Sequence, residues 1–269
     1  MDLNKFFFDL DGILSKGMGQ EAIQFIQDVM DEAIKQDDKK ALVAIYNEAG
    51  SLCRDFSKYE DAEKYYKEAL AIIEQLEANG SESHGTTLIN YGTSLGNSGR
   101  YDEAIDVYSE AAAILSSLEI NNDYRMAALY NNMSWIAQEK GNLEDAEDYL
   151  NKALFLLKRV ADSEGEEAAS YTNLANLYWA QGKLEESKVM LIKAVDIYKD
   201  NEGLKREGRY AAAISALANI FFSEEEYEKS ATLYKEAMNE IEKEFGQNDA
   251  WQIVAANLAD VEEKLKNTN

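Results

Sequence analysis

The fold is decided by the stretch YTNLANLYWAQGKLEESKVMLIKA, residues 171–194. Its first half places apolar residues at helical spacing from Tyr171 to Tyr178. Gly182 then stands where a helix commonly ends. Apolar residues three and four apart resume after Leu184. The stretch therefore predicts two helices, one over about Glu167–Gln181 and one starting near Leu184, joined by a short turn.

The same pattern recurs five times at about 42-residue spacing. Three columns of small residues advance together in steps of 42, 42, 41 and 43. The columns are Gly50, Gly92, Ser134, Ala175, Ala218; then Ala62, Ala104, Ala146, Ser187, Ser230; and finally Ala69, Ala111, Ala153, Ala194, Ala237. A fixed period of this size predicts a stack of helix pairs that bury a core only against their neighbours.

Bulky residues fall on other columns of the same register. They are expected to fill the space between helices, and the tyrosines among them are Tyr46, Tyr66, Tyr108, Tyr130, Tyr171 and Tyr234. The single cysteine, Cys53, falls on a core column, which favours a small buried side chain and excludes an internal disulfide.

Composition narrows the class of protein and of partner. The chain of 269 residues has no proline, whereas average usage would give roughly 13, and this favours a nearly all-helical fold. The net charge of -24 argues against nucleic acid and against an anionic membrane surface. It is explained either by a solvated acidic outer face or by steering of a basic partner.

No targeting or catalytic signal stands out. The sequence opens on acidic Asp2 with no secretory signal pattern and has no apolar run long enough to span a membrane, so the cytoplasm is expected. His84 is the only histidine, and it is expected to lie in a loop. This argues against a metal site with several histidine ligands and against a Ser-His or Cys-His catalytic pair. We expect no catalytic residues, no metal and no cofactor, and hence no enzyme.

The columns resemble the tetratricopeptide repeat (TPR). In that family the first helix carries a bulky residue, then a Leu-small pair and then an aromatic. A Gly-x-aromatic turn follows. The second helix carries Ala, a bulky residue and Ala. The fourth unit matches with Tyr171, Leu174-Ala175, Tyr178, Gly182-Lys183-Leu184, Ser187, Leu191 and Ala194. The resemblance covers about residues 41–266 and implies an all-α, right-handed α-solenoid of helix-turn-helix repeats.

These repeats are longer than the usual ~34 residues and lack the proline that often closes the second helix. The length, and strings such as Leu129-Tyr130-Asn131-Asn132, resemble the kinesin-light-chain type of TPR.

The chain is expected to divide into three parts. Residues 1–40 form a degenerate N-terminal repeat or cap, residues 41–248 form five TPR units, and residues 249–269 form a C-terminal capping helix. Within the first part, Leu3–Leu14 and Gln20–Lys35 are expected to be helices. Phe6–Phe8 are expected to plug the open end of the first repeat, or to form a self-association patch if they are exposed.

The first helices are expected to line the concave wall of the superhelix, where TPR proteins hold extended peptides or partner helices. Residues there are not needed for the core. Amides can pair with a peptide backbone, and large aromatics can anchor apolar side chains. In kinesin-light-chain-like repeats the matching asparagines contact ligand backbone, and the resemblance implies that role here. The candidate wall residues are Asn47, Asn90, Asn131, Asn132, Trp135, Asn173, Asn176, Trp179, Asn219 and Phe222.

Two alternatives stay open. In the first, the asparagines bond neighbouring helices; in the second, the tryptophans pack between repeats. The function expected is a non-catalytic scaffold for a protein or peptide partner, basic partners included, with no nucleic acid and no membrane. A peptide-responsive regulatory protein and a structural homo-oligomer are the other options.

Overall fold

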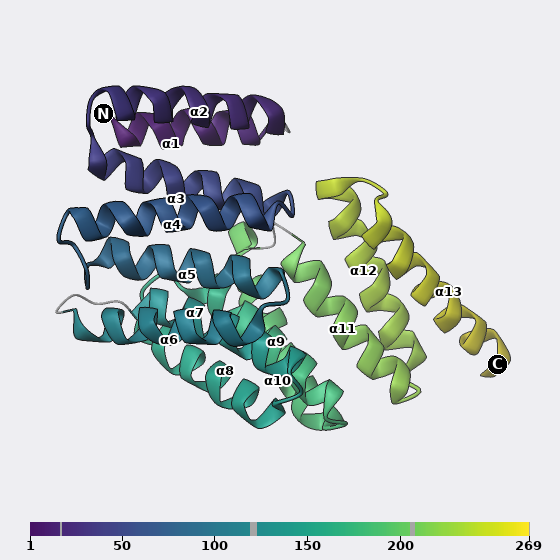
Figure 1. Cartoon of the computed structure of the whole chain (residues 1–269). Coiled ribbons are helices and arrows are strands. Elements are labelled where there is room, and N and C mark those ends of the chain that lie inside the picture. The colour runs from purple at the N-terminus through teal and green to yellow at the C-terminus, as the bar shows by residue number, and fades with distance from the viewer. Residues whose placement is uncertain (17, 119–122, 205–207, 269) are drawn as a thin grey trace. The chain divides into compact units, whose positions relative to one another are not determined.

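The computed structural model describes residues 1–16, 18–118, 123–204 and 208–268. These residues form α-helices and one short 3-10 helix, with no strand among them, so the predicted all-α class is confirmed. The α-helices, labelled in Figure 1, are α1 (Leu3–Leu14), α2 (Gly19–Lys35), α3 (Lys39–Asp55), α4 (Tyr59–Gln75), α5 (Glu82–Asn97), α6 (Tyr101–Ser117), α7 (Asp123–Glu139), α8 (Leu143–Leu157), α9 (Glu164–Ala180), α10 (Leu184–Asp200), α11 (Arg209–Ser223), α12 (Tyr227–Phe245) and α13 (Asp249–Thr268). The 3-10 helix is η1 (Glu202–Leu204).

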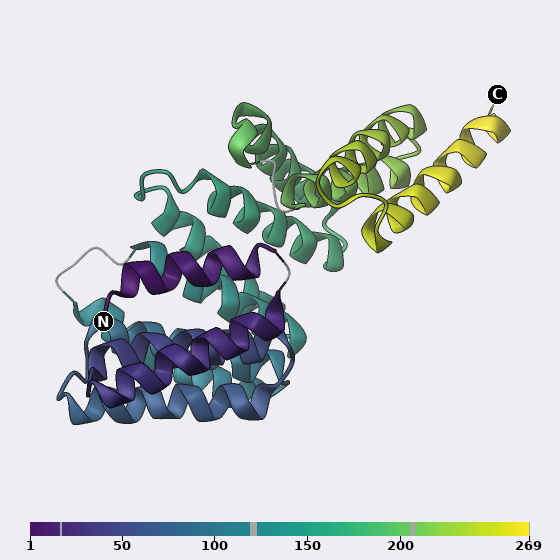
Figure 2. The ribbon, with the colours of Figure 1, turned by 90° about the horizontal axis from the view of Figure 1, so that it is seen from above.

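The chain forms two compact units, Met1–Ile136 and Ala137–Asn269, called unit 1 and unit 2 below. In unit 1, α2 packs on α3, α3 on α4, α4 on α5 and α5 on α6, so the helices stack in chain order (Figure 1). In unit 2 the same succession runs from α8 to α13, and Figure 2 shows α12 beside α13 at its C-terminal end. Odd-numbered helices from α3 onward are the first helices of pairs, and even-numbered ones are the second helices.

The turn inside each pair has one conformation throughout. Gly99, Gly141 and Gly182 adopt φ values of +81°, +76° and +75°, where glycine has no steric penalty. The first and fifth pairs hold Ser57 and Glu225 at this position, with φ of 57° and 62°. These two turns therefore keep the left-handed geometry without glycine, at a cost in backbone strain.

The first small column lets the two helices of a pair approach closely. A Cβ atom added to Gly50 would lie 2.7 Å from the Tyr66 ring, and one added to Gly92 would lie 2.6 Å from the Tyr108 ring. Both tyrosines are fully buried. The absence of a side chain on α3 and α5 therefore makes room for an aromatic ring on α4 and α6.

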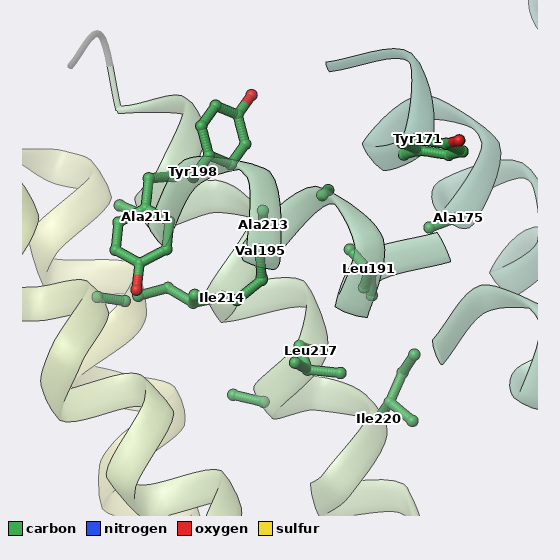
Figure 3. Close-up of a cluster of buried hydrophobic side chains, with 14 of the residues drawn as sticks. Tyr171, Ala175, Leu191, Val195, Tyr198, Ala211, Ala213, Ile214, Leu217 and Ile220 are labelled. Atoms are coloured by element: carbon green, nitrogen blue, oxygen red, sulfur yellow. The ribbon is translucent and has the colours of Figure 1, made fainter. Parts of the chain in front are cut away.

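Each unit has its own hydrophobic core. In unit 2, Leu191 and Val195 of α10 face Ile214 and Leu217 of α11 (Figure 3), and all four are buried. The core of unit 1 includes buried Phe6 of α1. Of the tyrosines predicted to be buried, Tyr66, Tyr108, Tyr171 and Tyr234 are, whereas Tyr46 and Tyr130 are half-buried. Cys53 is also half-buried, which corrects the expectation of a buried thiol.

Ion pairs join consecutive pairs of helices. The Arg100 guanidinium, at the turn before α6, lies 2.6 Å from Glu63 Oε2 of α4. Lys183, at the equivalent turn before α10, lies 3.6 Å from Glu147 Oε2 of α8. The same turn position is thus tied to the second helix of the preceding pair in both units.

The N-terminal helices lie where the sequence predicts them. Helix α1 has the predicted bounds, and α2 begins one residue earlier than expected. Phe6 is buried, whereas Phe7 is 37% exposed and Phe8 is 78% exposed. One of the three phenylalanines therefore fills the core, and the other two meet solvent.

Candidate functional site

The candidate residues lie on the first helices, whose exposed face we call the first-helix wall and describe separately in each unit. In unit 1 the wall is formed by α3, α5 and the part of α7 up to Ile136. In unit 2 it is formed by α9 and α11. The core columns hold the opposite face of each helix, so the wall residues are available for other contacts or for bonds between neighbouring first helices.

A groove runs along the wall of unit 1. Its volume is about 770 Å³, and α1, α3, α5 and the segment after α4 line it. Leu3, Phe7 and Val43 make part of the lining apolar, and Asn47 and Asn90 contribute amides. A pocket of this size that mixes apolar surface with a few polar groups is typical of a binding site.

The amides of the groove bond to one another across the helices. Asn47 Nδ2 donates to the Val43 carbonyl and to Thr87 Oγ1, both at 2.9 Å. Asn90 Nδ2 donates to Asn47 Oδ1 at 3.3 Å. Asn47 is only 9% exposed, so its amide serves to join α3 to α5. Asn90 is half-buried and retains an oxygen that can accept a hydrogen bond in the groove.

A similar link joins α5 to α7. Asn132 Nδ2 donates to Thr93 Oγ1 at 3.3 Å, and the Tyr108 hydroxyl lies 2.9 Å from the same atom. Trp135 is 37% exposed and meets the Tyr101 ring edge-on at 6.0 Å between centroids. Packing between repeats therefore explains part of what Asn132 and Trp135 do. Asn131 is half-buried on the same helix.

Glu48, which is not among the residues predicted from the sequence, also lines the groove. It stands 42 residues before Asn90, in the same column as Asn132 and Asn173. Burial raises the pKa of its carboxyl, and repulsion from Asp11 raises it further. Extending the asparagine column by one repeat toward the N-terminus would have found this residue.

In unit 2 the candidates of α9 form an exposed stripe. Asn173, Asn176 and Trp179 follow one another at three-residue spacing, and all three side chains are exposed. Trp179 is 42% exposed. Their neighbours Leu174, Ala175 and Leu177 are buried, so α9 presents its amides and its tryptophan on the face that the core does not use.

The candidate residues of α11 contact side chains of the following helix. The Tyr234 hydroxyl of α12 donates to Asn219 Oδ1, as the hydroxyls of Tyr66 and Tyr108 meet Ser51 and Thr93 in unit 1. Phe222 is half-buried, with its ring 5.6 Å from that of Tyr227. A tyrosine on the second helix thus forms a hydrogen bond with the polar residue that follows the small column. In the fourth repeat the equivalent of this tyrosine is Leu191, which has no hydroxyl to bond to Asn176.

Among the residues that the structure describes, no group of three or more His, Cys, Asp or Glu side chains could hold a metal ion. None of the described helices combines the length and the apolar character that crossing a bilayer would need.

Short stacked helix pairs, left-handed turns and small-residue columns define a helical-repeat protein. The sequence profile of the tetratricopeptide repeat matches residues 83–159, 126–200 and 166–239, and a second profile of the same repeat matches residues 42–77. The chain therefore belongs to the tetratricopeptide repeat family. No curated protein matches its sequence.

Solved structures share this fold at low sequence identity. BtubC (BKLC) from P. vanneervenii is 21% identical with a TM-score of 0.73, and the match covers 82% of this chain and 90% of that one. The TPR-like repeats of a Podospora anserina kinesin light chain are 16% identical with a TM-score of 0.60, over 74% and 93% of the two chains. The quorum sensor NprR from B. thuringiensis, in its apo form, is 15% identical with a TM-score of 0.69, over 92% and 67%.

Proposed function

We propose that this protein is a non-catalytic scaffold that binds a protein or peptide segment on its first-helix wall. The observation that carries the proposal is the groove of about 770 Å³ in unit 1, because it combines apolar surface with polar groups of α3 and α5. An extended peptide could place side chains against Leu3 and Phe7 and direct backbone groups toward Asn90.

The stripe on α9 supports the same use of unit 2. Asn173 and Asn176 carry amides that can both donate to and accept from a peptide backbone, and Trp179 offers a large exposed ring as an apolar anchor. We propose these three residues and Asn90 as direct contacts. Asn47, Asn131, Asn132, Trp135, Asn219 and Phe222 are proposed to frame the contacts by holding neighbouring helices.

The test uses the full chain and a displayed library of random nonapeptides. Binders are selected on the wild-type protein, and their affinities are measured by fluorescence anisotropy. A groove variant carries Phe7→Ala and Asn90→Ala, and a stripe variant carries Asn176→Ala and Trp179→Ala. We expect at least one of the two to lose about tenfold or more in affinity, because anchors at interface centres contribute about 2 kcal/mol or more.

The matched control replaces one exposed asparagine and one exposed aromatic on a second helix. Asn151→Ala with Phe155→Ala removes the same kinds of side chain from α8 in unit 2. We expect it to keep wild-type affinity. Loss of binding in the control alone would place the site on the second helices and refute the proposed wall. Failure to select any peptide would refute peptide binding itself.

A peptide-responsive regulator is the second candidate, because the quorum sensor NprR shares the fold over 92% of this chain. The two functions differ in what a bound peptide does. A static scaffold keeps its dimensions, whereas a regulator of this kind should compact measurably in small-angle X-ray scattering when a selected peptide is added. Light scattering over a concentration series would reveal the third option, a structural homo-oligomer.

A further inference from the structure

Glu48 breaks the pattern of amides along the first-helix wall. The column that holds Asn90, Asn132 and Asn173 begins at Glu48, with steps of 42, 42 and 41 residues. An amide carries no charge and can donate as well as accept, whereas an ionised carboxylate only accepts. The first repeat thus places a negative charge where the next three place a neutral amide.

The Glu48 carboxylate has no partner of its own. None of the described residues forms a hydrogen bond or an ion pair with it. Arg54, two turns along the same helix, attracts it from a distance, but the Arg54 guanidinium is bonded to Asp55 at 2.9 and 3.0 Å. Asp11 of α1 adds repulsion. A half-buried carboxylate in this setting gains free energy when a cation approaches.

The other charges of the groove do not supply that cation. Lys40 and Glu77 are exposed, so water screens them. Glu82 is paired with Arg125 of α7. Among the charged lining residues, Glu48 therefore combines partial burial with the absence of a counter-charge.

The apolar surface near Glu48 suits the stem of a long basic side chain. Val43 and Ala44 lie one turn before it on α3, and Leu3 and Phe7 of α1 line the same groove. Lysine and arginine bury their methylene groups along such surface while their charged ends reach a polar partner. Aspartate or glutamate would meet Glu48 with like charge.

We propose that the groove of unit 1 selects peptides through a lysine or arginine side chain, whose stem packs on Leu3 and Phe7 and whose cationic end binds the Glu48 carboxylate. The inference rests on the proposed function, since it names the class of peptide that the same wall takes. It adds a charged specificity determinant to a column whose next three members are neutral amides.

The test uses the full chain with immobilised nonapeptides whose flanking positions are randomised. The central residue is fixed as Lys, Arg, Gln, Leu or Glu in five separate pools. Binding is measured at constant ionic strength near 150 mM, because a chain of net charge -24 attracts any cationic peptide at low salt. The best single peptide and its central-Gln counterpart are then titrated in solution.

The variants separate local recognition from general attraction. Glu48→Gln keeps the shape of the side chain and removes the charge. Glu77→Gln removes one charge from an exposed position of the same groove and is the matched control. Glu48→Lys reverses the charge. Circular dichroism checks that the helix content of each variant equals that of the wild type.

We expect the Lys and Arg pools to bind best to the wild type. Glu48→Gln should weaken the best Lys or Arg peptide by about ten- to hundredfold, the range of a charge-assisted hydrogen bond, and Glu77→Gln by less than about threefold. Glu48→Lys should move the preference to the Glu pool. Peptides that bind without preferring Lys or Arg, or a preference that survives Glu48→Gln, would overturn this inference alone. Absence of binding by every pool would overturn the proposed peptide binding as well.

Discussion

Replacing Gly92 by alanine should destabilise the protein, although alanine is the better helix former. In an exposed helix the change would stabilise by about 1 kcal/mol. Here the new Cβ would lie 2.6 Å from Tyr108 Cε1 and 2.7 Å from Cδ1. The Tyr108 ring is fully buried and its hydroxyl lies 2.9 Å from Thr93 Oγ1, so it cannot move aside freely. Overpacking of this kind costs about 1–3 kcal/mol. After the gain in helix propensity is subtracted, the net loss is between about zero and 2 kcal/mol.

The fourth repeat supplies the compensating change. Its equivalent pair is Ala175 and Leu191, where a larger residue on the first helix meets a smaller one on the second. In the background of Tyr108→Leu, Gly92→Ala should therefore be neutral or stabilising by up to about 1 kcal/mol. The two substitutions should couple favourably by about 1–3 kcal/mol in a double-mutant cycle, which is the overpacking cost that the smaller side chain relieves.

Urea unfolding followed by circular dichroism measures these free energies, provided that the slope m is unchanged between variants. Gly12→Ala is the control, because a Cβ at Gly12 in α1 meets nothing within 4 Å and should only add helix propensity. The reasoning fails if Gly92→Ala stabilises as Gly12→Ala does, or if the two substitutions are additive.

Three further outcomes follow from single residues. Hydrogen bonds from Lys67, Arg100 and Tyr91 lower the pKa of Glu63 from 4.5 to about 2. The stabilising contribution of Glu63 is therefore complete above pH 4.5 and is lost as the pH falls toward 2, and Glu63→Gln should flatten this part of the acid-unfolding profile. Burial raises the pKa of Glu48, so the carboxylate is protonated at a higher pH than an ordinary glutamate. As the pH falls, binding of a lysine peptide should therefore begin to weaken at this higher pH, and titrations of Glu48→Gln should lack this pH dependence. Ser57→Gly should raise the free energy of unfolding by about 1 kcal/mol because Ser57 adopts φ of 57°, whereas Ser98→Gly at φ of -85° should lower it or leave it unchanged; a denaturant series on both variants decides this.

The sequence predicts most of the fold because helical-repeat architecture depends on local spacing. Helix α1 has the predicted bounds, and α10 begins at the predicted Leu184. Helix α9 begins three residues before the expected start, at Glu164, since a polar segment with acidic residues can continue a helix toward its N-terminus. The division into two compact units has no counterpart in the sequence, because the boundary falls inside the continuous helix α7.

The candidate site was less predictable, because a column shows which face a residue occupies but not which bond its side chain makes. Asn176 and Asn219 share a column and are both exposed, yet Asn219 accepts a hydrogen bond from Tyr234. That difference depends on the residue facing each of them from the second helix, which is Leu191 in one case and Tyr234 in the other. To predict which bond a wall residue makes, its column must therefore be read together with the column that faces it on the second helix.

The same pairing shows how such a wall can change its ligand without disturbing its core. Where a second helix carries tyrosine, the residue after the small column is held by the phenol, as Thr93 and Asn219 are. Where the second helix carries leucine, the residue after the small column receives no phenol hydrogen bond and is exposed, as Asn176 is. In the first two repeats the phenol bonds to Ser51 and Thr93, which follow the small column. Glu48 stands in another column, two places before the small one, where the next three repeats carry asparagine. Specificity can therefore vary at this position while the contact between the two helices of the pair stays the same, which is why the charge at Glu48 is the feature of the wall that we would test first.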